Sequence, residues 1–154
     1  MREFTEADKT RKKKRIEIPD NPADLSPDEL AKLTGDVKAG MKDGYLSCPV
    51  AWNIARNDDV PRIAVGERMD KLGARIIDCQ LGCFAVDKTF YSDDPSDTIP
   101  EELLQTMEEL NSEKLLTCVK AFELAAQYKV KPMKLGNEAT ARNIKIRQCQ
   151  LGCF

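Results

Sequence analysis

The chain repeats itself at a fixed offset of 70 positions. Residues 48–84 align with residues 118–154 without a gap, and 12 of the 37 aligned positions are identical. Six of these identities form one unbroken hexapeptide, CQLGCF, at residues 79–84 and 149–154. An internal repeat of this kind marks a supersecondary unit that occurs more than once. The sequence therefore predicts two homologous halves that fold in the same way.

Each half begins with a segment that has the periodicity of a helix. The apolar residues that follow helical spacing are Leu46, Val50, Ala51, Ile54 and Ala55 in the first half and Leu116, Val119, Phe122, Leu124, Ala125 and Tyr128 in the second. A polar break containing Pro61 or Pro132 follows, and proline is favoured in the first turn of a new helix. Each half is therefore expected to contain two helices joined by a short turn.

The second helix of each half is expected to end at a left-handed residue and to lead into a short strand. Gly73 and Asn143 stand where such a residue is wanted. The segments that follow, ARIID and IKIRQ, contain β-branched residues, which favour strands. The hexapeptide comes directly after, so each half is expected to run helix, turn, helix, strand.

A further helix is predicted before each repeat. Ser26 suits the N-cap position with Pro27 as the first helical residue, and residues 99–116 place four apolar side chains on one face. The predicted fold class is mainly α with short β, built from tandem duplicated helix-turn-helix-strand units that are each preceded by a helix. The predicted organisation is a basic, extended N-terminal tail at 1–25, a first unit at 26–84, an acidic linker at 85–98 and a second unit at 99–154.

The pattern of the halves is similar to that of a known module. The residues that carry the similarity are Glu123, Leu124 and Ala125 in a first helix and Asn143, Ile144, Lys145 and Ile146 after a second. An ELA helix, a turn and a second helix ending in a strand resembles the small helix-turn-helix modules of transcription regulators and of the N-terminal region of bacterial translation initiation factor two. The resemblance implies a helix-turn-helix fold in each half.

Composition excludes several classes of protein. No apolar run approaches the roughly 18 residues that a membrane helix needs, and the first residues are polar, unlike a secretory signal. We therefore expect a cytoplasmic protein with reduced thiols and no membrane segment. The chain contains no histidine, no glycine-rich phosphate loop and no Ser-His-Asp or Cys-His arrangement, so enzymatic activity is not expected.

The six cysteines occupy matching positions in the two halves. They are Cys48, Cys79 and Cys83 in the first half and Cys118, Cys149 and Cys153 in the second. One interpretation is that each set binds zinc or an iron-sulfur cluster, although three ligands fall one short of the usual four. A second is that the thiols pack in the core while Gly82 or Gly152 forms a turn. A third is a redox-sensing thiol pair, favoured at Cys149 by the nearby Lys145 and Arg147.

Charge is segregated along the chain, although the net charge is only −2. Residues 85–113 carry one basic and nine acidic side chains, whereas residues 114–154 carry eight and two. The residues suited to contact nucleic acid are Lys131, Lys134, Asn137, Arg142, Lys145 and Arg147, with the basic run at 11–15 as a further contact. The leading hypothesis is a non-enzymatic tandem helix-turn-helix protein without a cofactor that binds a macromolecule, DNA first and a protein complex second. The alternative is a cysteine-ligated metal protein or a thiol redox sensor.

Overall fold

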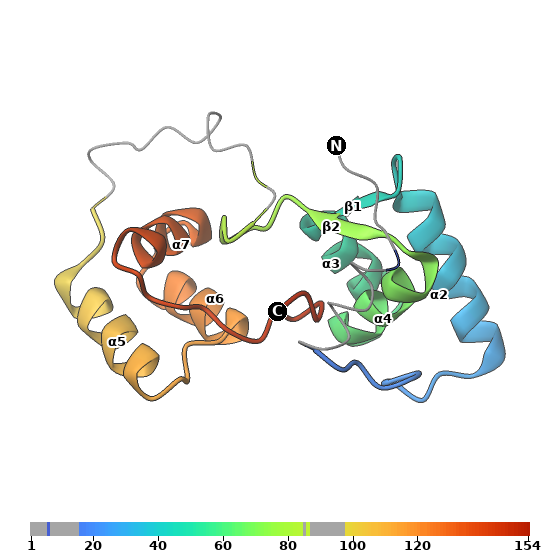
Figure 1. The fold of residues 1–154 in the computed structure, drawn as a ribbon, viewed down its shortest axis with the longest axis horizontal. Helices are drawn as coiled ribbons and strands as arrows, with labels where there is room; N and C mark the ends of the chain where they lie inside the picture. The colour runs from blue at the N-terminus through green and yellow to red at the C-terminus, as the bar shows by residue number, and fades with distance from the viewer. Residues whose placement is uncertain (1–5, 7–15, 85, 87–97) are drawn as a thin grey trace. The chain divides into compact units, whose positions relative to one another are not determined.

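The computed structural model of the chain describes Glu6, residues 16–84, Val86 and residues 98–154. The described part contains six helices and one two-stranded sheet (Figure 1), so the predicted fold class, mainly α with short β, is confirmed. The basic run at 11–15 and most of the predicted acidic linker lie outside the described residues. Each helix in the described part falls short of the length and apolar character that crossing a bilayer requires.

The chain forms two compact units that do not coincide with the two halves of the repeat. Unit 1 consists of Met1–Ile77 together with Gln150–Phe154, and unit 2 consists of Asp78–Cys149. The predicted halves, 26–84 and 99–154, differ from these units in where the hexapeptides belong. The first hexapeptide is part of unit 2, and nearly all of the second is part of unit 1.

The described part of unit 1 contains three helices and two short strands. In chain order these are α2 (Pro27–Gly40), β1 (Tyr45–Ser47), α3 (Cys48–Asn57), α4 (Arg62–Leu72) and β2 (Arg75–Ile77). The strands pair in parallel with Leu46 opposite Ile76, so α3 and α4 form the crossover between them. Helix α2 contacts both α3 and α4, and the buried Leu33 and Val37 of α2 contribute to the core of this unit.

Local sequence signals explain where the helices begin and end. The Ser26 hydroxyl accepts a hydrogen bond from the backbone N–H of Glu29, and the Glu29 carboxylate accepts one from the backbone N–H of Ser26, which makes the capping box that begins α2. Helix α4 ends at Gly73, whose φ of 69° lies in the left-handed region. Asn143 has a φ of 56° at the matching place in the second half. Both predicted left-handed positions are confirmed.

Unit 2 repeats the helix-turn-helix after a helix of its own. Its helices are α5 (Glu101–Ser112), α6 (Cys118–Gln127) and α7 (Pro132–Ala141). Thr117, just before α6, pairs in parallel with Arg147 after α7, as β1 pairs with β2 in unit 1. The buried cluster of this unit combines Leu103 of α5 and Leu135 of α7 with Leu81 of the first hexapeptide.

Three details of the predicted elements are wrong. Leu46 lies in β1 and not in the first helix, because a strand residue directly before α3 happens to continue the apolar spacing. The helix predicted over 99–116 ends at Ser112, and Lys114 follows with a left-handed φ of 61°. The strand predicted in the IKIRQ segment is reduced to the single bridge at Arg147.

Candidate thiol site

The first hexapeptide forms a turn, which is neither helical nor extended. The backbone N–H of Gly82 donates to the carbonyl oxygen of Cys79 over 2.8 Å, and Gly82 has a φ of 67°. Glycine adopts this left-handed conformation without steric cost. Gly152 of the second hexapeptide has a similar φ of 72°. The predicted role of these two glycines is confirmed, and the turn brings Cys83 back toward Cys79.

Cys79 is a buried thiol surrounded by hydrogen-bond donors. Its side chain is 7% exposed. The S–H of Cys83 donates to its sulfur, as do the backbone N–H groups of Leu81, Cys83 and Phe84. The bond from Cys83 is the largest influence, and together these donors lower the pKa of Cys79 to about 6 although burial acts in the opposite direction. The lowered pKa favours the thiolate form of Cys79, and a thiolate is the nucleophilic form of cysteine.

Cys83 is the protonated and exposed member of the pair. The hydrogen bond that it donates to Cys79 raises its pKa, and partial burial and the charge of Cys79 add to this. Electrostatic interactions with Cys118 and Cys149 raise the pKa of Cys83 as well, so their sulfurs lie within electrostatic range of it. Cys79 and Cys118 also belong to the same buried cluster. Four of the six cysteines are therefore gathered in unit 2.

The structure groups the cysteines differently from the sequence pattern, which placed Cys48 with Cys79 and Cys83. Cys48 begins α3 and belongs to unit 1, as does Cys153. Cys118 begins α6 and takes the corresponding place in unit 2. The cause is that the hexapeptide of each half packs in the unit built on the other half.

The Cys79–Cys83 pair is arranged for thiol chemistry. Among the residues that the structure describes, no three Cys, Asp or Glu side chains are arranged to hold a metal ion, so the zinc or iron-sulfur interpretation stays a prediction. A thiolate beside a second thiol can be oxidised to a disulfide. That reaction is the chemistry that the observed hydrogen bond between Cys83 and Cys79 supports most directly.

The residues predicted to contact nucleic acid lie on α7 and on the segments that flank it. Lys131 precedes the helix and is exposed, whereas Lys134 and Asn137 are half-buried. The Oδ1 atom of Asn137 is buried and lacks a hydrogen-bond partner within the described part of the chain. Within α7 only Thr140 and Ala141 are exposed. A helix that reads base edges presents an open face to the major groove, and α7 offers little such surface.

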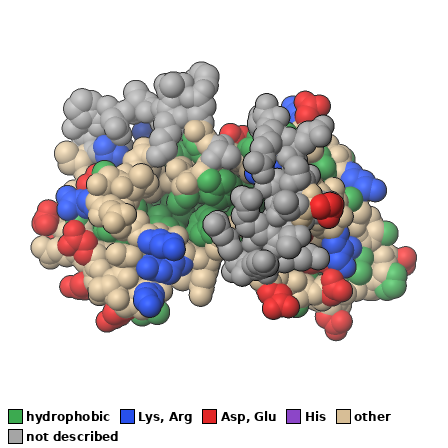
Figure 2. Space-filling model, viewed as in Figure 1, with side chains coloured by type: hydrophobic (Ala, Val, Ile, Leu, Met, Phe, Trp, Pro, Cys, Tyr) green, Lys and Arg blue, Asp and Glu red, His purple; other side chains and the backbone are tan. Residues whose placement is uncertain are grey.

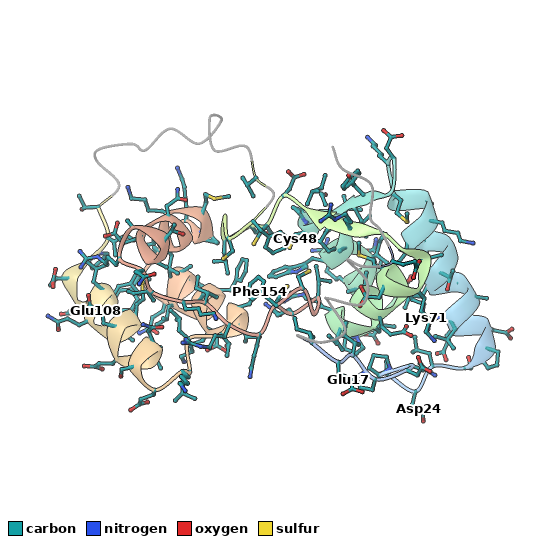
Figure 3. All side chains as sticks on the ribbon, in the orientation of Figure 1. Glu17, Asp24, Cys48, Lys71, Glu108 and Phe154 are labelled. Atoms are coloured by element: carbon teal, nitrogen blue, oxygen red, sulfur yellow. The ribbon has the colours of Figure 1, made fainter. Side chains whose placement is uncertain are left out.

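The remaining predicted contacts are partly held by other side chains of unit 2. Arg142 pairs with Glu138 at 2.7 Å and with Glu108, labelled in Figure 3, at 3.4 Å. Arg147 donates to the Oδ1 atom of Asn111 over 3.1 Å and to the carbonyl oxygen of Lys145 over 2.8 Å. Lys145 itself is exposed. Figure 2 shows acidic and basic side chains interspersed on the visible face.

Two glycines have a packing role that was not predicted from the sequence. A Cβ atom at Gly66 of α4 would lie 2.0 Å from the carbonyl oxygen of Leu151, and one at Gly136 of α7 would lie 1.7 Å from that of Leu81. Only glycine allows the leucine carbonyl to approach the helix this closely. The signal was present, because both glycines are identical positions of the repeat and lie inside helices, where glycine is unfavourable.

Unit 1 also has an open pocket of about 580 Å³, which the sequence did not indicate. The Arg62 guanidinium lies 3.4 Å from the centroid of the Trp52 ring at this pocket. Arg62 also donates a hydrogen bond to the Oε1 atom of Gln150, a residue of the second hexapeptide. The stacked arginine therefore connects the α3–α4 turn to that hexapeptide.

Comparison of the chain with protein-family models, with curated proteins and with solved structures finds no match. The likeness to helix-turn-helix modules is therefore one of sequence pattern and element order. The functional proposals rest on the residues and contacts of the chain itself.

Proposed function

We propose that the protein is a thiol-based redox sensor in which Cys79 is the reactive thiolate and Cys83 its resolving partner. The observation that carries the proposal is the S–H···S hydrogen bond from protonated Cys83 to Cys79, whose pKa is lowered to about 6. Redox-sensing cysteines combine a low pKa with a neighbouring thiol that can complete a disulfide. Cys79 has both features, and Cys83 is exposed to solvent.

The oxidant that fits this pair is a small hydroperoxide, because Cys79 is only 7% exposed. The thiolate of Cys79 attacks one peroxide oxygen, the O–O bond breaks, and a sulfenic acid forms on Cys79 as hydroxide leaves. The sulfur of Cys83 then attacks the sulfur of Cys79. An S–S bond forms, and the departing hydroxyl group takes the thiol proton and leaves as water. The two thiols lose two electrons, which reduce the peroxide.

Oxidation of the pair is coupled to the packing of the hexapeptide. The turn that contains both cysteines also carries Leu81, which is 1% exposed and whose carbonyl oxygen lies against Gly136. A disulfide removes the negative charge that the backbone N–H groups stabilise at the Cys79 sulfur, so we expect the conformation of the turn to change. The redox state of the pair is therefore expected to alter the contact between the hexapeptide and α7.

Peroxide treatment followed by alkylation and tryptic mass mapping tests the proposal. Trypsin separates the two hexapeptides, because cleavage after Arg75 and Lys88 releases residues 76–88 and cleavage after Arg147 releases residues 148–154. The expected product is a disulfide within residues 76–88. A reduced 76–88 peptide under conditions that oxidise the other cysteines would contradict the proposal.

Two variants separate the roles of the cysteines. Cys83→Ser should stop the reaction at a sulfenic acid on Cys79, which dimedone traps, because no resolving thiol remains. Cys79→Ser should give no disulfide within residues 76–88 and no dimedone adduct on Cys83, because the hydrogen-bonded thiolate of the pair has been removed. Sulfenic acid on Cys83 in place of Cys79 would reverse the assignment.

Binding of a macromolecule by the helix-turn-helix halves is a second proposal, with DNA as the first expected partner and a protein complex as the second. Its support is that Lys131 is the N-cap residue of α7 and Lys145 lies beyond the helix, both exposed. Phosphate groups are favoured near a helix N-terminus. A gel shift at low salt that is weakened by Lys131→Gln with Lys145→Gln is expected. Failure of both single-stranded and double-stranded DNA to shift would contradict the DNA branch.

A metal site is the remaining alternative. Unit 2 contains Cys79, Cys83, Cys118 and Cys149, and four sulfurs are the number that structural zinc and iron-sulfur clusters take. In the part of the chain that the structure describes, these side chains are not arranged as a metal site, so a bound metal would have to draw the four sulfurs together. Stoichiometric zinc or iron in protein purified without oxygen, lost on Cys79→Ser, would favour this alternative over the redox pair.

A further inference from the structure

Each compact unit is completed by the hexapeptide of the opposite half. Leu81 of the first hexapeptide belongs to the buried cluster of unit 2, and Gln150–Phe154 belong to unit 1. In Figure 1 the green segment after β2 runs beside α7, and the red segment at the end of the chain lies beside α4. The two crossing segments have the same sequence and meet equivalent helices. The exchange is therefore reciprocal.

The surface of unit 1 that receives the second hexapeptide is shaped for its backbone. The carbonyl oxygen of Leu151 would be 2.0 Å from a Cβ at Gly66, so the segment lies directly on the α4 backbone. A Cβ at Gly152 would lie 2.4 Å from the Cδ1 atom of Ile18 and 3.1 Å from that of Ile63. These two isoleucines enclose the turn of the hexapeptide. We call this surface, formed by Gly66, Ile18, Ile63 and Arg62, the α4 docking surface.

The α4 docking surface also recognises side chains of the hexapeptide. Leu151 is 1% exposed, so its side chain is fully enclosed in unit 1. Gln150 accepts a hydrogen bond from Arg62, whose guanidinium is itself held over the Trp52 ring. Gln, Leu and Gly are therefore each contacted by a different feature of the surface. Such a set of contacts can discriminate one peptide sequence from others.

We propose that the α4 docking surface is a peptide-binding site whose ligand in trans is the second hexapeptide of another copy of this chain. The contacts described for Gln150, Leu151 and Gly152 are the same whether the segment comes from the same molecule or from a neighbour. Two molecules that donate these segments to each other form a dimer without any new interface chemistry. The equilibrium between the monomer and the dimer is therefore set by the covalent linkage between segment and surface. The molecule's own segment has a high effective concentration at the surface, which favours the monomer.

Two complementary full-chain variants test the proposal. Gly66→Leu blocks the docking surface but keeps the hexapeptide, whereas a chain that stops after Gln148 keeps the surface but has no second hexapeptide. Each variant alone is expected to be monomeric. Mixed in equal amounts, they are expected to form a one-to-one heterodimer, which light scattering after size exclusion detects as a doubled mass. No heterodimer from two folded variants would overturn the proposal.

The matched control is the Gly66→Leu variant with Leu151→Asp added. A carboxylate cannot be enclosed where Leu151 is buried, so the affinity for the truncated chain should fall at least about a hundredfold. Equal dimerisation with Leu151 and with Asp at this position would show that the association does not use the docking surface, and would also overturn the proposal.

A second experiment applies if the truncated chain does not fold. The unaltered protein is refolded from urea at low and at high concentration, and the dimer fraction is measured before it can relax. The dimer is expected to increase with the concentration during refolding and to be absent in Leu151→Asp. A monomer at every concentration would overturn the proposal, whereas the redox behaviour of Cys79 would be unaffected by either result.

Discussion

Replacement of Gly66 by alanine should destabilise the protein, although alanine is the better helix former. An added methyl group lies 2.0 Å from the Leu151 carbonyl oxygen, whereas ordinary contact begins at 3.4 Å, so full relief of the clash moves the hexapeptide backbone by about 1.4 Å. Leu151 is 1% exposed, and partial loss of its burial costs about 2–3 kcal/mol. The gain in helix propensity offsets about 0.5–1 kcal/mol of this. The expected net loss is about 1–2.5 kcal/mol.

Gly35 of α2 provides the matched control, because a Cβ there meets nothing within 4 Å. Gly35→Ala should therefore stabilise the protein by about 0.5–1 kcal/mol. Urea unfolding followed by circular dichroism compares both variants with the parent protein, and the two shifts should have opposite signs. Stabilisation by Gly66→Ala similar to that by Gly35→Ala would refute the close contact between α4 and the hexapeptide.

Three further predictions concern titratable groups. Cys83→Ala should raise the pKa of Cys79 more than Cys83→Ser does, because serine retains a hydrogen-bond donor; thiolate absorbance against pH measures both. The pKa of Cys79 falls from an ordinary value of 9.0 to about 6 on folding, so its thiolate contributes stability that is fully present above pH 9 and is lost as the pH falls through 6. Urea unfolding of Cys79→Ala should lack this pH dependence. Glu67 is 3% exposed, and burial raises its pKa. Hydrogen bonds from Arg68 and from Lys71, which Figure 3 labels, outweigh burial and hold the pKa of Glu67 below the ordinary value of 4.5. Glu67→Gln should cost about 1–3 kcal/mol above that pH and less below it.

The helices could be predicted because their signals are local. Ser26 and Pro27 mark the start of α2 through capping and proline geometry, and Gly73 marks the end of α4. Strand β1 could not be predicted in the same way. It is three residues long, and its hydrogen bonds go to β2, which lies beyond two helices in the sequence. Three residues are too few to show an alternating pattern, so nothing in its own sequence distinguishes it from the helix that follows.

The destination of the hexapeptides could not be predicted from the sequence, because the two segments are identical and both halves carry the glycine that receives them. Gly66 meets the carbonyl oxygen of Leu151 and Gly136 that of Leu81, which are equivalent contacts at the two sites. The choice depends on the path of the chain between the elements, which side-chain patterns do not encode. The structure brings Cys79 and Cys83 together as the hexapeptide pattern indicated. It also places Cys118, and not Cys48, in the same unit as this pair, and nothing in the sequence indicates that exchange.

The pKa of Cys79 is the most direct test of the thiol site. The folded protein is alkylated by a small reagent at a series of pH values from acidic to alkaline, and mass spectrometry of the tryptic peptide 76–88 gives the rate at each pH. That rate reports the fraction of thiolate at this site. The expected profile has a midpoint at about pH 6 for Cys79. It should move toward the ordinary thiol range in Cys83→Ala. A midpoint near 9.0 for Cys79 in the unaltered protein, the ordinary value of a thiol, would contradict the account.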